Sequence, residues 1–302
     1  MSGELLIRPA VLDDLPEIYE VQYEATLEDL PLPPPGNGVL SKFRHELAEA
    51  RTRVAVQGDR ILGFGAVFER ADVAFLATLH VRPSAQQAGL GVGRQLLEQL
   101  FQHGYWRRAV VSSRLPRAVA LYARYGMPPR WPLYMLELDV SRMRALPVSD
   151  ISVIAAESGD PQLPAMDAAV AGRGARPADL AYWERERGGE PFWLVRRGAR
   201  LGYGYAQHLY RSSDAPWSPE HLMIGPIGVL DAEDAPDAVV AAVRWAAPQT
   251  PRLVMDVSGP HPALKTLLDA GFIITYDATV GFGGDQPIYD PMRYIISDTI
   301  TL

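Results

Sequence analysis

Three glycines, Gly89, Gly91 and Gly93, alternate with other residues shortly after an apolar segment that Pro83 stops. The pattern predicts a strand over residues 75–81, a glycine-rich loop, and a helix with one apolar face. That face carries Leu96, Leu97, Leu100 and Phe101. Such a unit directs bare backbone N–H groups at one point, with the positive end of the helix dipole behind them. Glycine is needed in the loop because a side chain would hold an anion away from the backbone. The segment therefore predicts a site for a phosphate or diphosphate group.

Two familiar phosphate-binding loops do not match this segment. A dinucleotide-binding loop has glycine at its sixth position, where counting from Gly89 gives Arg94, and the Walker loop ends in Gly-Lys-Ser/Thr. What the segment does contain is Val81-x-Pro83, followed by Gln86-x-x-Gly89-x-Gly91. This arrangement resembles the loop that holds the CoA diphosphate in the GCN5-related N-acetyltransferase (GNAT) superfamily. A glycine-rich connection without a ligand is the alternative.

The resemblance implies that CoA lies along the preceding strand and the loop. Counted from Pro83, Gln86 with Gly89 and Gly91 takes the family's positions. Counted from the helix leucines, Gly91 and Gly93 fit better, and Ala88 replaces the glutamine, so both registers stay open. The residues implied for acetyl-CoA binding are Leu79, Val81, Gln86, Gln87, Ala88, Gly89, Leu90, Gly91, Val92, Gly93 and Arg94.

Residues 115–127 read Leu-Pro-Arg-Ala-Val-Ala-Leu-Tyr-Ala-Arg-Tyr-Gly-Met. They resemble the helix after the fifth strand of the same superfamily, Asn-x-x-Ala-x-x-Leu-Tyr-x-x-x-Gly-Phe, except that Leu115 and Met127 replace the asparagine and the phenylalanine. The resemblance implies that the Tyr122 hydroxyl lies near the CoA sulfur and protonates the departing thiolate. A phenol with a pKa of about 10 can donate to a thiolate with a pKa of about 8.5 when a hydrogen bond holds the two together. A tyrosine that only packs beside Leu121 is the alternative.

The sequence does not fix the base that would deprotonate an amine acceptor. The family often places a carboxylate on the fourth strand, but residues 73–81 contain none. His80 has a suitable ordinary pKa of about 6.5. Its neighbours Leu79 and Val81 set the register of the strand, so His80 is expected to be structural or at the surface. Asp72, at the start of the strand, is a second candidate.

The chain repeats itself at a domain-sized interval. Residues 54–66 and 193–205 each predict a β-hairpin whose second strand opens with Leu-Gly-aromatic-Gly. Arg108–Ser112 parallels Arg252–Asp256, and each is followed by a helix that ends at a glycine. The repeat predicts two tandem GNAT-like domains, over residues 1–143 and 150–302. Each is expected to be an α/β (α+β) domain, a mixed and mostly antiparallel sheet with helices on both faces.

The second copy lacks the features that carry chemistry in the first. Asp231, Glu233, Asp234 and Asp237 stand where the first half has its glycine loop, and Leu267 stands in place of Tyr122. Carboxylates at that position would repel a diphosphate. We therefore expect a degenerate domain without cofactor that walls the acceptor pocket. Aromatic segments are candidates for that wall, although a place in the core is the alternative; they are residues 203–205, Trp217 and residues 289–294.

Composition narrows the class of protein. The 302 residues include no cysteine, and the six histidines stand apart, which argues against disulfides and a dedicated metal site. A net charge of −7 argues against nucleic-acid binding. Neither a secretory signal nor an apolar run of about 20 residues is found. We expect a soluble, cytoplasmic protein without metal, nucleic-acid or membrane partners.

Together these features predict an N-acetyltransferase that moves an acetyl group from acetyl-CoA to a primary amine. The expected mechanism is direct attack in a ternary complex, on a small amine or a peptide. A sensor or structural module that binds acyl-CoA without turnover is the alternative. The sequence leaves open whether the protein is a monomer or a homodimer.

Overall fold

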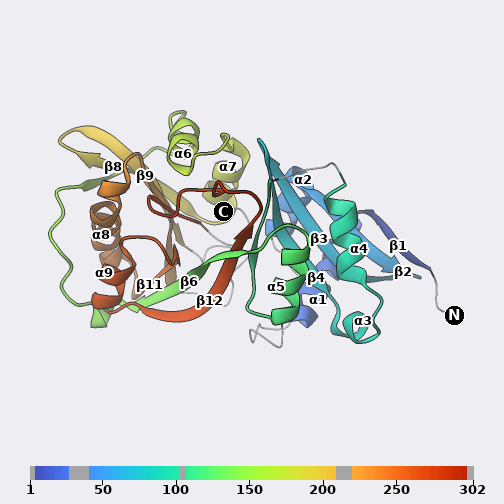
Figure 1. The fold of residues 1–302 in the computed structure, drawn as a ribbon. Coiled ribbons are helices and arrows are strands. Elements are labelled where there is room, and N and C mark those ends of the chain that lie inside the picture. The colour runs from blue at the N-terminus through green and yellow to red at the C-terminus, as the bar shows by residue number, and fades with distance from the viewer. Residues whose placement is uncertain (1–3, 27–40, 103–106, 209–219, 298–302) are drawn as a thin grey trace.

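The structure is a computed structural model that describes residues 4–26, 41–102, 107–208 and 220–297. Thirteen strands of the described residues form a single sheet (Figure 1). The first half supplies β1 Leu5–Pro9, β2 Arg51–Gln57, β3 Arg60–Arg70, β4 Val73–Val81, β5 Arg107–Ser112 and β6 Pro129–Asp139. The second half supplies β7 Ser152–Ala155, β8 Gly189–Arg196, β9 Ala199–His208, β10 His221–Val229, β11 Arg252–Ser258, β12 Ile273–Phe282 and β13 Tyr294–Ile295.

The helices follow the same order in the two halves, except that the short helix α3 of the first half has no α-helical counterpart in the second. Those of the first half are α1 Leu15–Thr26, α2 Ser41–Glu49, α3 Pro83–Gln87, α4 Val92–Leu100 and α5 Pro116–Arg124. Those of the second half are α6 Leu163–Ala171, α7 Pro177–Glu186, α8 Ala235–Ala246 and α9 Leu264–Asp269. Helices therefore cover both faces of a mixed sheet. Only β4–β5 and β10–β11 pair in parallel among the named strands, so the expected fold class is confirmed.

The two halves exchange strands at the centre of the sheet. The strand order is β1-β2-β3-β4-β5-β12-β6-β11-β10-β9-β8-β7, and β13 also pairs with β10. Strand β12 of the second half thus lies between β5 and β6 of the first, while β6 pairs with β11 of the second (Figure 1). The segment between the halves carries one 3-10 turn, Val140–Arg142, and no further regular element before β7. The first half of the chain ends at this segment, but the hydrogen-bonded sheet is continuous between the two halves.

Apolar packing explains why helices lie on both faces. On one face of the first half, Leu96 and Leu97 of α4 pack with Val110 of β5. On the opposite face, Ile18 of α1 packs with Phe64 of β3. A further core cluster joins the halves, because it contains residues of β3, β4, β5 and β6 together with α6, α7, β9 and β12. The exchanged strands therefore share a core as well as hydrogen bonds.

Most elements expected from the sequence are present. Strands β1 and β7 are the two edges of the sheet, and the two predicted hairpins are β2–β3 and β8–β9. The connection after β4 differs from the expected open loop. Pro83 begins the short helix α3, since proline suits the first position of a helix. Gly93 already belongs to α4, so only residues 88–91 form the turn.

Candidate active site

Strands β4 and β5 diverge after a short stretch of pairing. They pair in parallel over Val73–Leu76 and Arg107–Val110, and β5 then pairs with β12 on its other side. The register between β3 and β4 shifts at Ala77, which forms a bulge. A bulge bends its strand and increases the local twist. The sheet therefore has a gap between the end of β4 and β5.

Main-chain groups of β4 face this gap. The Arg82 amide donates to the Leu62 carbonyl on β3 at 2.8 Å. Amides alternate sides along a strand, so those of Leu79 and Val81 point away from β3 and toward the gap. The Val81 carbonyl lies on the same side and accepts a hydrogen bond from Gln86 Nε2 at 2.7 Å.

The glycine turn positions a helix start beside the gap. Gly89 and Gly91 have φ of +67° and +65°, a left-handed conformation that favours glycine. The first hydrogen bond of α4 joins the Gln95 amide to the Gly91 carbonyl at 3.1 Å. The amides of Val92, Gly93 and Arg94 come before it and have no partner within the helix. A Cβ on Gly91 would meet nothing closer than Arg94 Nε at 3.9 Å, so the turn has room for a ligand.

A cavity of about 710 Å³ runs through the gap. On one side it is lined by the glycine turn, α4 and α5; on the other it reaches α1, α2, β6, β11 and β12. All residues predicted to hold acetyl-CoA line it except Gln87, Ala88 and Leu90. Arg94, Arg117 and Arg124 also line the helix side, so this end of the cavity suits an anionic ligand.

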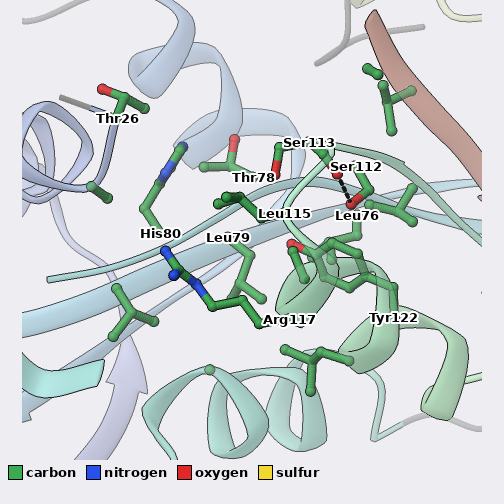
Figure 2. Close-up of a pocket in the computed structure, with 18 of the residues that line it drawn as sticks. Thr26, Leu76, Thr78, Leu79, His80, Ser112, Ser113, Leu115, Arg117 and Tyr122 are labelled. Atoms are coloured by element: carbon green, nitrogen blue, oxygen red, sulfur yellow. Dashed lines mark hydrogen bonds between the residues drawn. The ribbon is translucent and has the colours of Figure 1, made fainter. Parts of the chain in front are cut away.

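Tyr122 projects from α5 into this cavity (Figure 2). Its side chain is 9% exposed and belongs to the apolar cluster of α4, α5 and β5. Burial raises the pKa of Tyr122 to about 12. The hydroxyl therefore keeps its proton at physiological pH, as an acid requires. Its role as the acid remains a prediction.

The α1–α2 side of the gap carries polar groups that the sequence did not single out. The Thr78 hydroxyl on β4 donates a hydrogen bond to the buried Glu46 carboxylate on α2. Lys42, also on α2, lines the same side of the cavity. No sequence motif marks Thr78 and Lys42, because their position at the cavity depends on how α2 packs over β4.

The two candidate bases have different positions. His80 is half-buried in the cavity wall, with its ring centroid 5.5 Å from that of Phe64 (Figure 2). Burial, helped by the charge of Lys42, lowers the pKa of His80 to about 3, so this imidazole stays neutral. Asp72 does not line the cavity; it pairs with Arg107 at 2.5 Å at the opposite end of β4. Of the two, only His80 can meet a substrate in this cavity.

The second half contributes to the same cavity through the exchanged strands. Asp256 of β11 and Tyr276 of β12 both line it, and in the register each faces Met135 of β6. The aromatic residues expected in this wall lie elsewhere. Tyr203, Tyr205, Tyr289 and Tyr294 are at most 1% exposed, in the core, and Trp217 is outside the described residues. A contribution of the second half to the cavity wall was expected, but Asp256 and Tyr276 were not among the residues predicted for it.

Comparisons with known proteins identify the family to which this part of the chain is related. Residues 12–127 match the model of the acetyltransferase (GNAT) family. Residues 12–127 therefore belong to a GNAT domain. Members of this family are acyltransferases, and the gap, the glycine turn and Tyr122 all lie in or directly beside the matched residues. No curated protein matches the sequence.

Solved structures show that the tandem GNAT fold extends over nearly the whole chain. A putative acetyltransferase from Pyrococcus horikoshii is similar at 16% identity, over 98% of this chain and 95% of its own, with a TM-score of 0.73. A tandem GNAT protein from the clavulanic acid biosynthesis pathway is similar at 19% identity, over 94% and 100%, with a TM-score of 0.60. A glucosamine N-acetyltransferase region of a fungal multi-domain β-N-acetylglucosaminidase matches at 16% identity, over 93% of this chain and 38% of its own, with a TM-score of 0.66.

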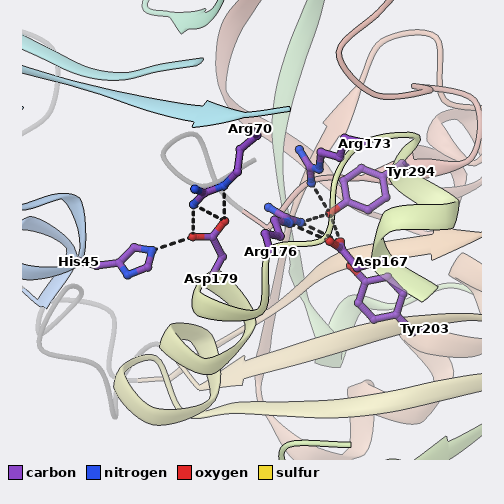
Figure 3. A network of polar contacts seen from close by, with 8 residues as sticks. All are labelled: His45, Arg70, Asp167, Arg173, Arg176, Asp179, Tyr203 and Tyr294. Carbon is purple, nitrogen blue, oxygen red and sulfur yellow. Dashed lines mark hydrogen bonds and ion pairs between the residues drawn. The ribbon is translucent and has the colours of Figure 1, made fainter. Parts of the chain in front are cut away.

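A buried polar network fixes α2 of the GNAT domain to α7 of the second half (Figure 3). His45 Nε2 lies 2.8 Å from Asp179 Oδ1, and Arg70 Nη2 donates to the same oxygen at 2.7 Å. Burial would raise the pKa of Asp179, but the hydrogen bond from His45 and the charges of Arg176 and Arg70 outweigh it and lower the pKa. The ionised carboxylate thus holds α2, the helix that carries Lys42 and Glu46, against α7.

The corresponding gap in the second half is filled. Strands β10 and β11 pair only over residues 221–223 and 252–254, then diverge. Beyond that point β13 enters the space, because Tyr294 pairs with Gly228 and Ile296 bridges to Asp256. At the start of the following helices, the Asp231 side chain accepts a hydrogen bond from the Glu233 amide. The second half therefore fills with its own chain the positions that face a cavity in the GNAT domain.

The described residues show two further features relevant to the earlier expectations. They contain no helix that is long and apolar enough to span a membrane. Nor does this part of the chain bring together three or more His, Cys, Asp or Glu side chains in a way that could hold a metal ion.

Proposed function

We propose that the protein transfers an acetyl group from acetyl-CoA to a primary amine. The cavity through the β4–β5 gap is the observation that supports this proposal, because it joins an anion-binding helix start to a space beneath α1 and α2. Acetyl-CoA would supply the activated thioester. In the reaction the amine nitrogen bonds to the acyl carbon, the carbon–sulfur bond breaks, and the amine loses one proton while the thiolate gains one.

Each part of the wall has a distinct task in this proposal. The amides of Val92, Gly93 and Arg94 bind the diphosphate, and the gap-facing amides of Leu79 and Val81 orient the pantetheine arm and the acyl oxygen. Tyr122 Oη holds the proton for the departing sulfur. The buried surroundings that raise the pKa of Tyr122 also raise that of a thiolate, which keeps proton transfer between the two feasible.

His80 faces the attacking amine in this arrangement. With a pKa of about 3, it presents a neutral imidazole, which can accept a hydrogen bond from the amine. The positive charge of Lys42 beside it disfavours an ammonium at this position. The site thus favours the neutral amine that attack requires.

We further propose that residues 1–143 hold the cofactor and residues 150–302 hold none. The filling of the second gap by β13 supports this division. One acetyl-CoA per chain is therefore expected in calorimetric titration.

The test pairs acetyl-CoA titration with a thiol-release assay across amines. Tyr122→Phe is expected to bind acetyl-CoA as the wild type does and to lose about 10²- to 10⁴-fold in kcat, the range for general acids. Tyr125→Phe is the matched control, because the Tyr125 hydroxyl bonds to Glu98 at 3.1 Å and does not line the cavity. Undiminished turnover by Tyr122→Phe would contradict its role. Cofactor binding without turnover by the wild type, on any amine, would favour the sensor.

A further inference from the structure

Two hydrogen-bonding side chains of β4, Thr78 and His80, stand on the face of the sheet that α1 and α2 cover. His80 packs against Phe64 of the core cluster of α1 and α2, and Thr78 bonds to Glu46 of α2. Leu79, between them, packs with α4 on the opposite face. Figure 2 shows Thr78 and His80 pointing to the same side of the strand. Both line the cavity, so they meet an acceptor from one side.

Glu46 fixes the direction of the Thr78 hydroxyl. Thr78 donates its hydroxyl proton to the Glu46 carboxylate, and the two residues are 5% and 1% exposed. A carboxylate accepts hydrogen bonds, whereas a hydroxyl has one proton and two lone pairs. Because its proton is held by Glu46, Thr78 Oγ1 can only accept a hydrogen bond from a molecule in the cavity.

His80 presents a second acceptor beside the first. Burial, helped by the charge of Lys42, lowers the pKa of His80 to about 3, so the ring is neutral and one of its nitrogens accepts a hydrogen bond. Thr78 and His80 are two residues apart on one strand, which separates their Cα atoms by about 6.6–7 Å. A single nitrogen atom between the two side chains can therefore lie at about 3 Å from both acceptors.

We propose that Thr78 Oγ1 and the His80 ring each accept one N–H hydrogen of the attacking nitrogen, which makes the acceptor a primary amine in preference to a secondary one. A neutral primary amine has two N–H groups and one lone pair. With both N–H groups bonded, the lone pair is left to attack the acyl carbon. A secondary amine has a single N–H and leaves one acceptor without a partner. This inference rests on the proposed function and names the residues that would select among amines.

The first test uses the wild-type protein with ethylamine, hexylamine and phenethylamine, each beside its N-methyl derivative. An unsatisfied acceptor in a buried site is expected to lower kcat/KM for the N-methyl member about 10- to 100-fold. Equal kcat/KM for the two members of each pair would overturn the inference without affecting the proposed acyl transfer. Turnover of none of these amines would overturn the proposed function, and this inference with it.

The second test separates hydrogen bonding from steric exclusion of the methyl group. Thr78→Val keeps the shape of the side chain and removes the acceptor, so the preference for the primary amine is expected to disappear while acetyl-CoA affinity stays unchanged. Thr78→Ser retains a hydroxyl and is expected to keep the preference. His80→Phe keeps an aromatic ring against Phe64 without an acceptor, and is expected to act as Thr78→Val does. The wild-type preference in either Thr78→Val or His80→Phe would overturn the assignment of two acceptors.

Thr52 provides a matched control. It faces Ala66 of β3 from β2, as Thr78 does from β4, and its hydroxyl donates to the main-chain carbonyl of Glu46 at 3.1 Å. Thr52 is 7% exposed and does not line the cavity. Thr52→Val therefore removes a comparable buried hydrogen bond beside α2 and is expected to keep the wild-type preference. A loss as large as that of Thr78→Val would show that the preference reports only the packing of α2, and would overturn the inference.

Glu46→Gln tests whether Glu46 acts through Thr78. A glutamine amide can donate to the hydroxyl and turn its proton toward the cavity. The substitution is expected to reduce the preference for the primary amine in the wild-type background but not in Thr78→Val, which has no hydroxyl to orient. An equal effect in both backgrounds would show that Glu46 does not orient Thr78. Whether or not Glu46→Gln folds, Thr78→Val and Thr78→Ser decide whether Thr78 selects the acceptor.

Discussion

Two gaps in one sheet, β4–β5 and β10–β11, arise from the same strand arrangement, but one is open and the other is filled. The first is open and leads to a cavity of about 710 Å³. The second is occupied by β13, whose Tyr294 and Ile295 are fully buried. The difference shows that divergence of two parallel strands does not by itself make a binding site. A site also requires that the chain leave the space free and supply amides rather than carboxylates beside it.

Replacing the residue that fills the second gap should have the largest effect. Tyr294 is fully buried, and its hydroxyl accepts hydrogen bonds from Arg176 at 2.5 Å and Arg173 at 3.0 Å. Tyr294→Ala should lower the free energy of unfolding by about 3–5 kcal/mol, the cost of truncating a large core aromatic. Denaturant titration measures this change.

Tyr122→Ala is the matched control for this comparison, because its ring borders a cavity that is already open. It should cost less stability than Tyr294→Ala. Equal losses for the two variants would contradict the distinction between a filled gap and an open one. A second acetyl-CoA site in Tyr294→Ala would show that β13 alone keeps the second half empty.

A histidine in each half allows the comparison to be sharpened by pH. His261 is 3% exposed, and burial lowers its pKa to about 4. The unfolded chain takes up this proton near pH 6.5 but the folded protein only near pH 4, so stability is complete above pH 6.5 and falls between these values. The loss should reach about 3 kcal/mol by pH 4.

His261→Asn removes this titration and can still accept the hydrogen bond that the Ala263 amide gives to Nδ1 at 3.2 Å. The wild type should therefore lose more stability than the variant between pH 6.5 and 4, as followed by chemical denaturation. Parallel curves for the two proteins would show that His261 does not contribute. His80, whose pKa is lowered to about 3, should also cost stability as the pH falls, but to the same extent in the wild type and in His261→Asn.

Placing a carboxylate in the glycine turn of the first half, as the second half has at the corresponding position, should have the smallest effect of the three changes described in this comparison. Gly91→Asp places a carboxylate beside the amides of α4, as Asp231 does at the start of the corresponding helices. Repulsion of the diphosphate should weaken acetyl-CoA binding about 10- to 100-fold, consistent with about 1–4 kcal/mol per close charge pair.

Gly91→Asn is the control, because asparagine has the same shape and also tolerates a positive φ. Titrating both variants with acetyl-CoA isolates the effect of the charge on affinity. If Gly91→Asp and Gly91→Asn bind acetyl-CoA equally, carboxylates do not explain the difference between the halves.

Local elements of this protein could be predicted from its sequence, because their signals lie within short segments. The alternation of Gly89, Gly91 and Gly93 marked the turn, and the repeat marked the hairpins of both halves. The position of Tyr122 in the cavity followed from a motif of 13 residues, 115–127. What these signals share is that the residues that define each element are neighbours in the chain.

The exchange of strands could not be predicted, because it depends on pairings between distant residues. Nothing in β12 itself says that Thr279 will pair with Ser112. For the same reason Asp256 was overlooked, although the repeat aligned it with Ser112, which also lines the cavity. The occupation of the second gap by β13 was likewise hidden, since Tyr294 and Ile295 read as ordinary core residues.

The placement of β12 between β5 and β6 also determines when the sheet can be completed as the chain is synthesised. When the ribosome has released the chain as far as the linker after β6, both neighbours of β12 still present unpaired amides and carbonyls to the solvent. The strand that covers them is translated only after β7 to β11. The first half, although made first, therefore cannot complete its sheet until β12 is made, and a premature stop between β6 and β12 would leave two exposed edges that can pair with other chains.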